Sequence, residues 1–271
     1  MVPDIDHLTS LLDQVRLRQP VVHAITNTIT AGDVADVLRA IGARPIMAVA
    51  VEEVEEIVSR ADALLLNLGT PTPERVKAMV LAGRRANSLG KPVAFDPVGV
   101  TASRFRFDSA RRILSELRLA VIKGNRAEIG HLAGMEGELR GLDAVAGPAD
   151  LFAAANILSR QRRTVVAVSG ERDLVVGNDQ ALVVENGHPL MGRVTGTGCM
   201  LGGVIAAFAA VETDVMVATV AAVACFGLAG ERAGHGVVGP AGFKSAMIDS
   251  LHVLTAEQMR IGAKISVGAK E

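Results

Sequence analysis

Short apolar runs alternate with amphipathic stretches along most of this chain. The amphipathic stretches carry apolar residues three or four positions apart, which predicts helices, and the apolar runs are about four to six residues long, which predicts buried strands. The predicted helices are Ile5–Arg18, Ala31–Ile41, Val51–Arg60, Pro73–Leu89, Phe107–Leu117, Arg126–Leu132 and Ala149–Arg160. The predicted strands between them are Val21–Ile25, Pro45–Ala48, Ala63–Leu68, Pro92–Phe95, Leu119–Ile122 and Thr164–Val168. This alternation predicts an α/β fold with a mostly parallel central sheet and helices on both faces.

The second half of the chain changes pattern. Two short apolar runs, Asp173–Val176 and Ala181–Val184, predict an antiparallel hairpin. The segment from Gly134 to Gly147 has no clear period, and we expect it to be mostly loop. Further helices are expected from Cys199 to about Val211, over Val215–Ala229, from Gly239 to Leu254, and over Thr255–Ala263. No linker or repeat interrupts the chain, so residues 1–271 are expected to form a single domain.

Composition narrows the classes of function. The chain has 28 basic and 29 acidic residues, for a formal net charge of −1, and it lacks Trp and Tyr. A near-neutral chain without base-stacking aromatics is not expected to bind nucleic acid or an anionic membrane surface. Cys199 and Cys225, the two cysteines, cannot build a Cys-rich zinc site and suggest no disulfide framework. With no signal peptide in the first residues, we expect a cytoplasmic protein.

Two uncharged stretches, Val194–Val211 and Val215–Gly230, approach the length of a membrane-spanning helix. Both are rich in Ala, Gly and Val, poor in Leu, and flanked by no Trp or Tyr. Two helices buried in a protein core explain them better, and we expect no membrane contact.

Polar residues gather where the predicted strands end. In open parallel sheets, ligands bind at the carboxyl ends of the strands, so these side chains mark the expected site. They are Asn27, Asn67, Asp96, Lys123, Asn125 and Ser169.

The segment from Val194 to Gly203 combines a Gly-rich turn, Thr195–Gly198, with the start of an apolar helix. Free N–H groups at a helix N-terminus favour an anion such as a phosphate. Cys199 falls in the first helical turn, a position that lowers a thiol pKa and favours the thiolate, so we expect it to act as a base. The alternative is a turn before a buried helix, with Cys199 as a small core residue.

Two further motifs follow predicted strands. Asp96 is either the cap of a turn or a carboxylate that faces a metal or a phosphate. Asn125 and Glu128 form either a helix-capping pair or part of a Mg²⁺ site. A Cys–His hydrolase is conceivable, but no partner base can be identified: His23, His188 and His235 show no catalytic or metal pattern. The chain contains neither a Walker A loop nor a dinucleotide fingerprint.

Taken in order, several segments resemble the hydroxyethylthiazole kinase family over nearly the whole chain. They are Val22–Asn27, Gly42–Ala48, Asp96–Gly99, Lys123–Ile129, Val168–Asp173, and Asn186–Leu190 running on to Gly196–Cys199. The resemblance implies a ribokinase-like fold in which ATP phosphorylates the hydroxyl of 4-methyl-5-(2-hydroxyethyl)thiazole, a step of thiamine salvage. It also implies Mg²⁺ and a homotrimer with thiazole sites near the subunit interfaces.

The resemblance also implies roles for individual residues. Cys199 takes the catalytic position, where most ribokinase-like kinases carry Asp. Met47 and Gly196 fall on substrate-contact positions, with Asn27 nearby. The nucleotide would contact Lys123 and Ser169, with Asn125 grouped beside them, and Asp96 and Glu128 match the positions associated with Mg²⁺.

Three departures from the family pattern bear on specificity. Lys123 stands where the family often has Arg, Ser169 replaces a common Thr, and the loop Thr28–Asp33 differs after Asn27.

Two alternative functions stay open. One is a ribokinase-like kinase of another small hydroxymethyl compound, of pyrimidine or pyridoxal type, against which Cys199 in place of Asp argues. The other is a nucleotide-binding protein without catalysis, against which the set Asp96, Glu128 and Cys199 argues.

Overall fold

The computed structural model describes residues 2–135, 148–177 and 179–268, and within them the strands form one sheet in the order β2-β1-β3-β4-β5-β6-β7-β8-β9. The first six strands in this order are parallel, which confirms the expected mostly parallel sheet. They are β1 (Val21–Ile25), β2 (Arg44–Ile46), β3 (Ala63–Asn67), β4 (Val93–Asp96), β5 (Val121–Asn125) and β6 (Val165–Ser169). Beyond residue 135, the loop expected up to Gly147 lies outside the described residues.

An antiparallel extension completes the sheet beyond β6. The predicted hairpin is confirmed as β7 (Asp173–Gly177) and β8 (Gln180–Val184). The sheet ends in β9 (Ile265–Val267), which pairs with β8 and was not predicted. A three-residue strand carries too little alternation to be seen in sequence, and only its long-range pairing defines it.

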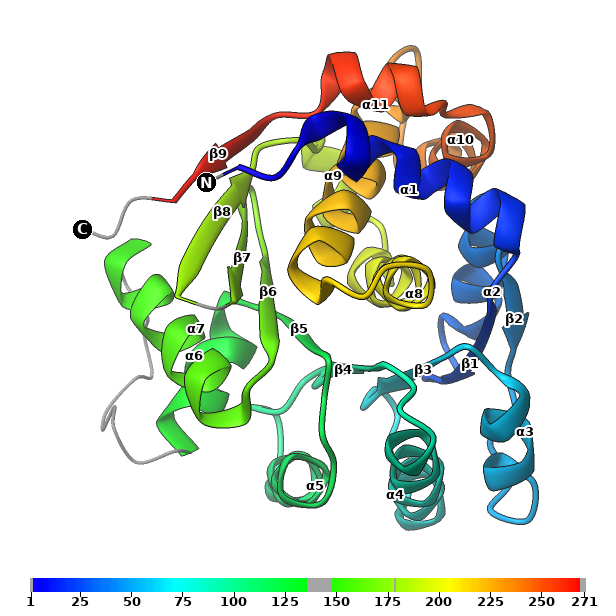
Figure 1. Ribbon diagram of the computed structural model, residues 1–271, viewed down its shortest axis with the longest axis vertical. Coiled ribbons are helices and arrows are strands. Elements are labelled where there is room, and N and C mark those ends of the chain that lie inside the picture. Colours follow the sequence, from blue (N-terminus) through cyan, green and yellow to red (C-terminus); the bar gives the residue numbers. More distant parts are fainter. Residues whose placement is uncertain (1, 136–147, 178, 269–271) are drawn as a thin grey trace.

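Helices cover both faces of the sheet (Figure 1). One face carries α3 (Val54–Arg60), α4 (Pro73–Ser88), α5 (Arg104–Glu116), α6 (Arg126–Met135) and α7 (Pro148–Arg162). The other carries α1 (Ile5–Arg18), α2 (Ala31–Ala40), α8 (Thr197–Ala209), α9 (Val215–Ala233), α10 (Pro240–Val253) and α11 (Ala256–Gly262). A short 3-10 helix, η1 (Pro189–Arg193), precedes α8. Each face packs its own hydrophobic core against the sheet.

Local capping explains where several helices begin and end. The helix expected from Phe107 begins at Arg104, because the Ser103 side chain accepts a hydrogen bond from the backbone N–H of Arg106 at 3.3 Å. The end of α2 is as expected: Gly42 follows it with φ +94°, a left-handed conformation that glycine adopts without strain.

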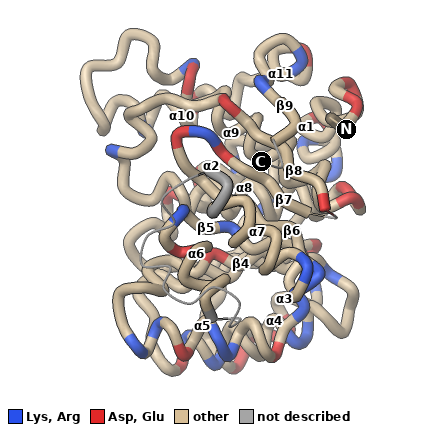
Figure 2. Tube along the Cα trace, turned by 90° about the vertical axis from the view of Figure 1, so that its left-hand side faces the viewer, with Lys and Arg blue, Asp and Glu red and all other residues tan. Residues whose placement is uncertain are grey.

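Helices α8 and α9 are the central pair on their face, and both are almost fully buried. By length and composition α9 could cross a membrane, but 78% of its apolar stretch is buried within the protein. Small residues allow the pair to pack closely against each other and the sheet. In the view of Figure 2, basic and acidic positions lie interspersed along the chain rather than gathered on one face.

Strand alternation decides what lies beneath α8. Side chains on a strand alternate between the two faces. Ala94 and Val121 pack into the core on the α8 side, so Asp96 and Lys123, two residues further on, point to that same side. Leu65 and Asn67 follow the same rule. The sheet therefore presents a row of polar side chains beneath the N-terminus of α8.

Candidate active site

The N-terminus of α8 is open and depends on a glycine. Gly196 occupies the N-cap position with φ +91°, and no side chain caps the helix. A Cβ at Gly196 would overlap Cγ2 of Thr30 and lie 2.9 Å from its Cβ. The turn therefore needs glycine both for its backbone conformation and for its contact with Thr30. Uncapped N–H groups at a helix start favour an anion, so this turn has the geometry that an anion site needs.

Buried amides connect this turn to the sheet. The Nδ2 of Asn27 lies 3.3 Å from Sγ of Cys199, 3.1 Å from Oδ1 of Asn67 and 2.8 Å from Oγ1 of Thr30. Asn67 in turn donates from Nδ2 to Oδ2 of Asp96 at 3.0 Å. Polar groups from the ends of three strands thus meet the first turn of α8, as the polar strand ends predicted.

The expected low pKa of Cys199 is wrong. The helix N-terminus does favour a thiolate, but burial and then the negative charge of Asp96 raise the pKa of the Cys199 thiol. Hydrogen bonds from Thr30 and Asn67 and the charge of Lys123 oppose this shift without reversing it. At neutral pH Cys199 is therefore mainly a thiol, in contact with a donor amide that would support its thiolate form.

Asp96 and Lys123 form the buried charged centre of the site. Nζ of Lys123 lies 3.5 Å from Oδ2 of Asp96, and both side chains are 5% exposed or less. Burial raises the pKa of Asp96 to about 7, opposed by Lys123 and increased further by Glu128. Burial alone would lower the pKa of Lys123, but the negative charges of Asp96, Glu128 and Cys199 outweigh it and raise that pKa.

The Lys123 ammonium also reaches the helix start. A Cβ at Gly198 would lie 2.7 Å from Nζ of Lys123, so the ammonium sits directly against the first turn of α8. A positive charge and a helix N-terminus thus face the same space, which suits a phosphate group. The Oδ1 atom of Asp96 is buried and has no hydrogen-bond partner, so it remains available to a cation.

Asn125 and Glu128 form a helix-capping pair, which is one of the two arrangements that the sequence predicted for them. The backbone N–H of Glu128 donates to Oδ1 of Asn125 at 3.0 Å, and the N–H of Asn125 donates to Oε2 of Glu128 at 2.8 Å. Oε1 of Glu128 accepts from the N–H of Gly99 at 2.9 Å, which ties the loop after β4 to the start of α6. Each carboxylate oxygen keeps a further lone pair, so capping and a role near Mg²⁺ are compatible.

The other predicted residues spread along the same sheet edge. Asn125 and Ser169 are direct partners across β5 and β6, and Oγ of Ser169 donates to the carbonyl of Gly124 at 3.4 Å. Met47 is half-buried and follows β2, the strand at the opposite end of the parallel part. The fold therefore brings Asn27, Asp96, Lys123, Gly196 and Cys199 together, with Asn125 and Ser169 on one side and Met47 on the other.

His23 has a structural contact near Met47. Its Nε2 lies 2.9 Å from the carbonyl of Ala48 and holds the loop after β2, and burial lowers its pKa. This contact is structural, in keeping with the absence of a catalytic or metal pattern around His23 in the sequence.

Three residues have contacts in the site to which the sequence assigned no individual role, although it placed Asn67 among the polar strand ends and Gly198 in the Gly-rich turn. Asn67 lies at the centre of the site, Thr30 contacts both Asn27 and Gly196, and Gly198 admits the Lys123 ammonium. A signal existed for Asn67, since it ends a strand two positions after a core-facing leucine. Thr30 and Gly198 owe their roles to contacts between distant segments, which leave no local pattern.

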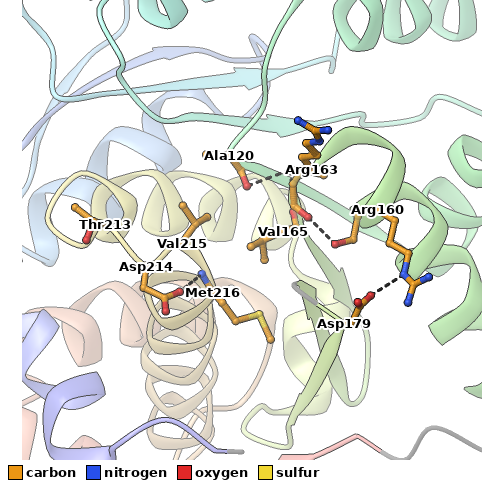
Figure 3. A pocket seen from close by; sticks show the side chains of 11 residues that line it. Ala120, Arg160, Arg163, Val165, Asp179, Thr213, Asp214, Val215 and Met216 are labelled. Atoms are coloured by element: carbon orange, nitrogen blue, oxygen red, sulfur yellow. Dashed lines mark hydrogen bonds and ion pairs between the residues drawn. The ribbon is translucent and has the colours of Figure 1, made fainter.

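A hollow of about 720 Å³ lies elsewhere, at the amino ends of β5 and β6 (Figure 3). Several of its polar side chains are bonded within the protein: Arg160 pairs with Asp179 at 2.6 Å, and Oγ1 of Thr164 donates to the carbonyl of Ala120 at 3.1 Å. It faces away from the carboxyl ends of the strands, where Asp96 and Cys199 meet. The catalytic chemistry is therefore assigned to the opposite edge.

Known proteins match this chain over almost its full length. A model of the hydroxyethylthiazole kinase family matches residues 12–257. A hydroxyethylthiazole kinase of Chloroflexus aggregans is 49% identical over 260 residues, covering 96% of this chain and 94% of that protein. The solved structure of a hydroxyethylthiazole kinase protein from Pyrococcus horikoshii OT3 has a TM-score of 0.90 and 38% identity, covering 97% of this chain and 99% of that one.

The fold class is also found in more distant structures. A ribokinase-like superfamily protein of Enterococcus faecalis V583 superposes with a TM-score of 0.63 at 16% identity, covering 90% of this chain and 93% of that one. At that identity the likeness shows the fold alone, and it confirms the expected ribokinase-like architecture.

Proposed function

Because the chain belongs to the hydroxyethylthiazole kinase family, it phosphorylates hydroxyethylthiazole, and we propose that Cys199 is the catalytic base of that reaction. The observation that carries this proposal is the position of the Cys199 sulfur, in the first turn of an uncapped helix and 3.3 Å from a donor amide of Asn27. The phosphate acceptor is the side-chain hydroxyl of 4-methyl-5-(2-hydroxyethyl)thiazole, and the product enters thiamine salvage.

The proposed step is a direct phosphoryl transfer from ATP. The substrate hydroxyl oxygen forms a bond to the γ-phosphorus while the bond to the bridging oxygen of ADP breaks, and the hydroxyl proton passes to the deprotonated Cys199 sulfur, which becomes a thiol. Gly196 and Met47 contact the thiazole alcohol, and Asn27 orients its hydroxyl. Positioning and charge stabilisation supply most of the acceleration in such a transfer.

The phosphate side of the site uses the start of α8 and Lys123. N–H groups after Gly196 and the Lys123 ammonium would stabilise the charge on the transferring group. Ser169 and Asn125, on the neighbouring strand ends, would contact the nucleotide. A single ammonium provides a point charge in place of the two-pronged contact of arginine.

Mg²⁺ fits the residues present. Oδ1 of Asp96 is buried without a partner, and Glu128 retains free lone pairs. Among the described residues, no group of three or more His, Cys, Asp or Glu could hold a metal ion. This agrees with Mg²⁺ in nucleotide sites, which is held by few carboxylates together with phosphates. When bound, the ion would neutralise charge on the phosphates, with Asp96 and Glu128 as its protein anchors.

Glu128→Gln is expected to raise the Mg²⁺ concentration needed for half-maximal turnover and to lower turnover strongly at limiting Mg²⁺. The amide places an NH₂ group against one of the two backbone N–H donors, so unfolding free energy should also fall by about 1–3 kcal/mol. Turnover as a function of Mg²⁺ concentration, together with thermal melting, separates the two effects. Wild-type turnover at limiting Mg²⁺ would contradict the assignment of Glu128.

We further propose a homotrimer in the cytoplasm, with the thiazole sites near subunit interfaces. Light scattering under assay conditions should give a mass of about three times the 28.2 kDa of the chain. A stable monomer at assay concentrations would contradict the trimer and the placement of the thiazole site, with its proposed contact Met47, near a subunit interface.

A coupled assay of ADP release tests the function itself. The chain should form ADP in the presence of ATP, Mg²⁺ and the thiazole alcohol. Matched reactions with a hydroxymethylpyrimidine and with pyridoxal separate this activity from the other kinases of the fold. ADP release that depends on one of those alcohols, and not on the thiazole alcohol, would overturn the proposed substrate.

A further inference from the structure

Asn67 bridges the two halves of the buried polar row beneath α8, from Asn27 on one side to Asp96 on the other. It is fully buried at the end of β3, between the strand that leads to Asn27 and the strand that ends in Asp96. Its Oδ1 lies 3.1 Å from Nδ2 of Asn27, and its Nδ2 donates to Oδ2 of Asp96 at 3.0 Å.

Backbone donors fix which way each amide points. Oδ1 of Asn67 accepts from the N–H of Gly69 at 3.0 Å, so its NH₂ group must face Asp96. Oδ1 of Asn27 accepts from the N–H groups of Ile29 and Thr30 at 3.0 and 2.9 Å, so its NH₂ group faces Oγ1 of Thr30, Asn67 and Cys199. The donors and acceptors of both amides are therefore fixed: Asn67 donates to Asp96, and the NH₂ group of Asn27 faces the Cys199 sulfur.

The packing leaves little freedom for another arrangement. Asn67 and Asp96 are 0% exposed, Asn27 is 4% exposed, and a Cβ at Gly69 would lie 2.6 Å from Cβ of Asn27. Asp96 is held independently by Lys123 at 3.5 Å, so it can serve as the fixed end of the row. Buried, fully bonded amides of this kind hold their neighbours in one geometry.

We propose that Asn67 is a positioning residue, which orients the Asn27 amide and through it the Cys199 sulfur towards the substrate hydroxyl. This inference rests on the role proposed for Cys199. Asn67 acts on the Cys199 sulfur from within the protein and is not itself a proton acceptor in the reaction. Its function is to keep a hydrogen-bond donor facing the sulfur, so that the base is held in place as it takes the proton.

Two substitutions remove the bridge in different ways. Asn67→Leu keeps the approximate shape and removes all polarity, whereas Asn67→Ser is smaller, stays polar and cannot span the gap. Each should lower kcat with the thiazole alcohol by about 10- to 100-fold, the loss typical of a misplaced catalytic group. Since Asn27 keeps its two backbone donors, KM should change by less than about threefold. The binding of the thiazole alcohol, measured by calorimetry without turnover, should change equally little.

Asn87→Leu is the matched control. Asn87 is half-buried at the other end of the sheet, where it donates to the carbonyl of Arg118 at 2.8 Å and accepts from its N–H at 2.7 Å. The same chemical change there should lower the melting temperature without reducing kcat per folded molecule.

A double-mutant cycle with Cys199→Ala distinguishes positioning from a merely structural role. If Asn67 acts through Cys199, the factor by which Asn67→Ser lowers kcat should be at least about threefold smaller in the Cys199→Ala background. An equal decrease of kcat in the two backgrounds would overturn the inference, as would wild-type kcat in both Asn67 variants. If the wild-type chain forms no ADP with the thiazole alcohol, the proposed function fails and this inference falls with it; an active wild type with unaffected Asn67 variants refutes this inference alone.

Discussion

Cys199→Ala is expected to lower kcat with the thiazole alcohol by about 10²–10⁴-fold, the usual contribution of a general base. Substrate and nucleotide binding should change much less, because the start of α8 and Lys123 remain in place. Cys199 is only 8% exposed, so loss of its buried sulfur should also lower the free energy of unfolding, and turnover is compared per folded molecule. Steady-state kinetics and thermal melting on the same preparations check both statements. Unchanged turnover in Cys199→Ala would rule out the base.

Cys199→Asp separates a base from a covalent nucleophile. A carboxylate can also accept the hydroxyl proton, so this variant should retain more activity than Cys199→Ala. A covalent role for Cys199 would make Asp as inactive as Ala, and a phosphocysteine should then be trapped on the wild-type chain. Pure core packing would instead lower the melting temperature and leave turnover per folded molecule unchanged.

The raised pKa of Cys199 adds a pH dependence to this prediction. The base acts when it is deprotonated, and burial together with Asp96 holds its pKa above the ordinary thiol value. The thiolate fraction, and with it kcat, should therefore rise as pH rises from about 7 to 9. The residual turnover of Cys199→Ala should lack this rise. A wild-type profile that is flat over this range would contradict the assignment.

Gly196→Ala is expected to lower turnover by about 10²-fold, since it displaces the first turn of α8. The backbone at φ +91° strains any residue with a side chain, which should cost about 1–3 kcal/mol of unfolding free energy. The added methyl group also overlaps Cγ2 of Thr30. Kinetics and chemical denaturation of the variant check the two effects.

Thr30→Ser provides a partial rescue of that variant. It removes Cγ2 and keeps the hydroxyl that bonds to Asn27, so the double variant should recover part of the lost turnover. Gly242→Ala is the control, because a Cβ there meets nothing within 4 Å and its φ is not positive. Full activity in Gly196→Ala would show that the turn tolerates displacement and has no positioning role.

Sequence alone predicted the parts of this protein that depend on local pattern. Alternation placed the strands of the parallel sheet, and the residue that ends each strand marked the site, as with Asp96 and Asn125. The glycine-rich turn before an apolar helix predicted the uncapped start of α8 for the same reason, since helix starts and strand ends are local features. The capping pair of Asn125 and Glu128 was also visible, because its two members lie three positions apart.

The tertiary structure alone decided how these parts act on one another. The pKa of Cys199 rises because α8 packs over the end of β4 and brings the sulfur under the influence of a buried Asp96, which no local rule for a helix N-terminus contains. Asn67 lies between Asn27 and Asp96 because β3 pairs with β1 and β4 in the sheet. In the chain, β2 comes between β1 and β3, so sequence order does not give this neighbourhood. Burial and charge act through space and depend on segments far apart in the chain, so sequence named the residues of the site while packing set their protonation and contacts.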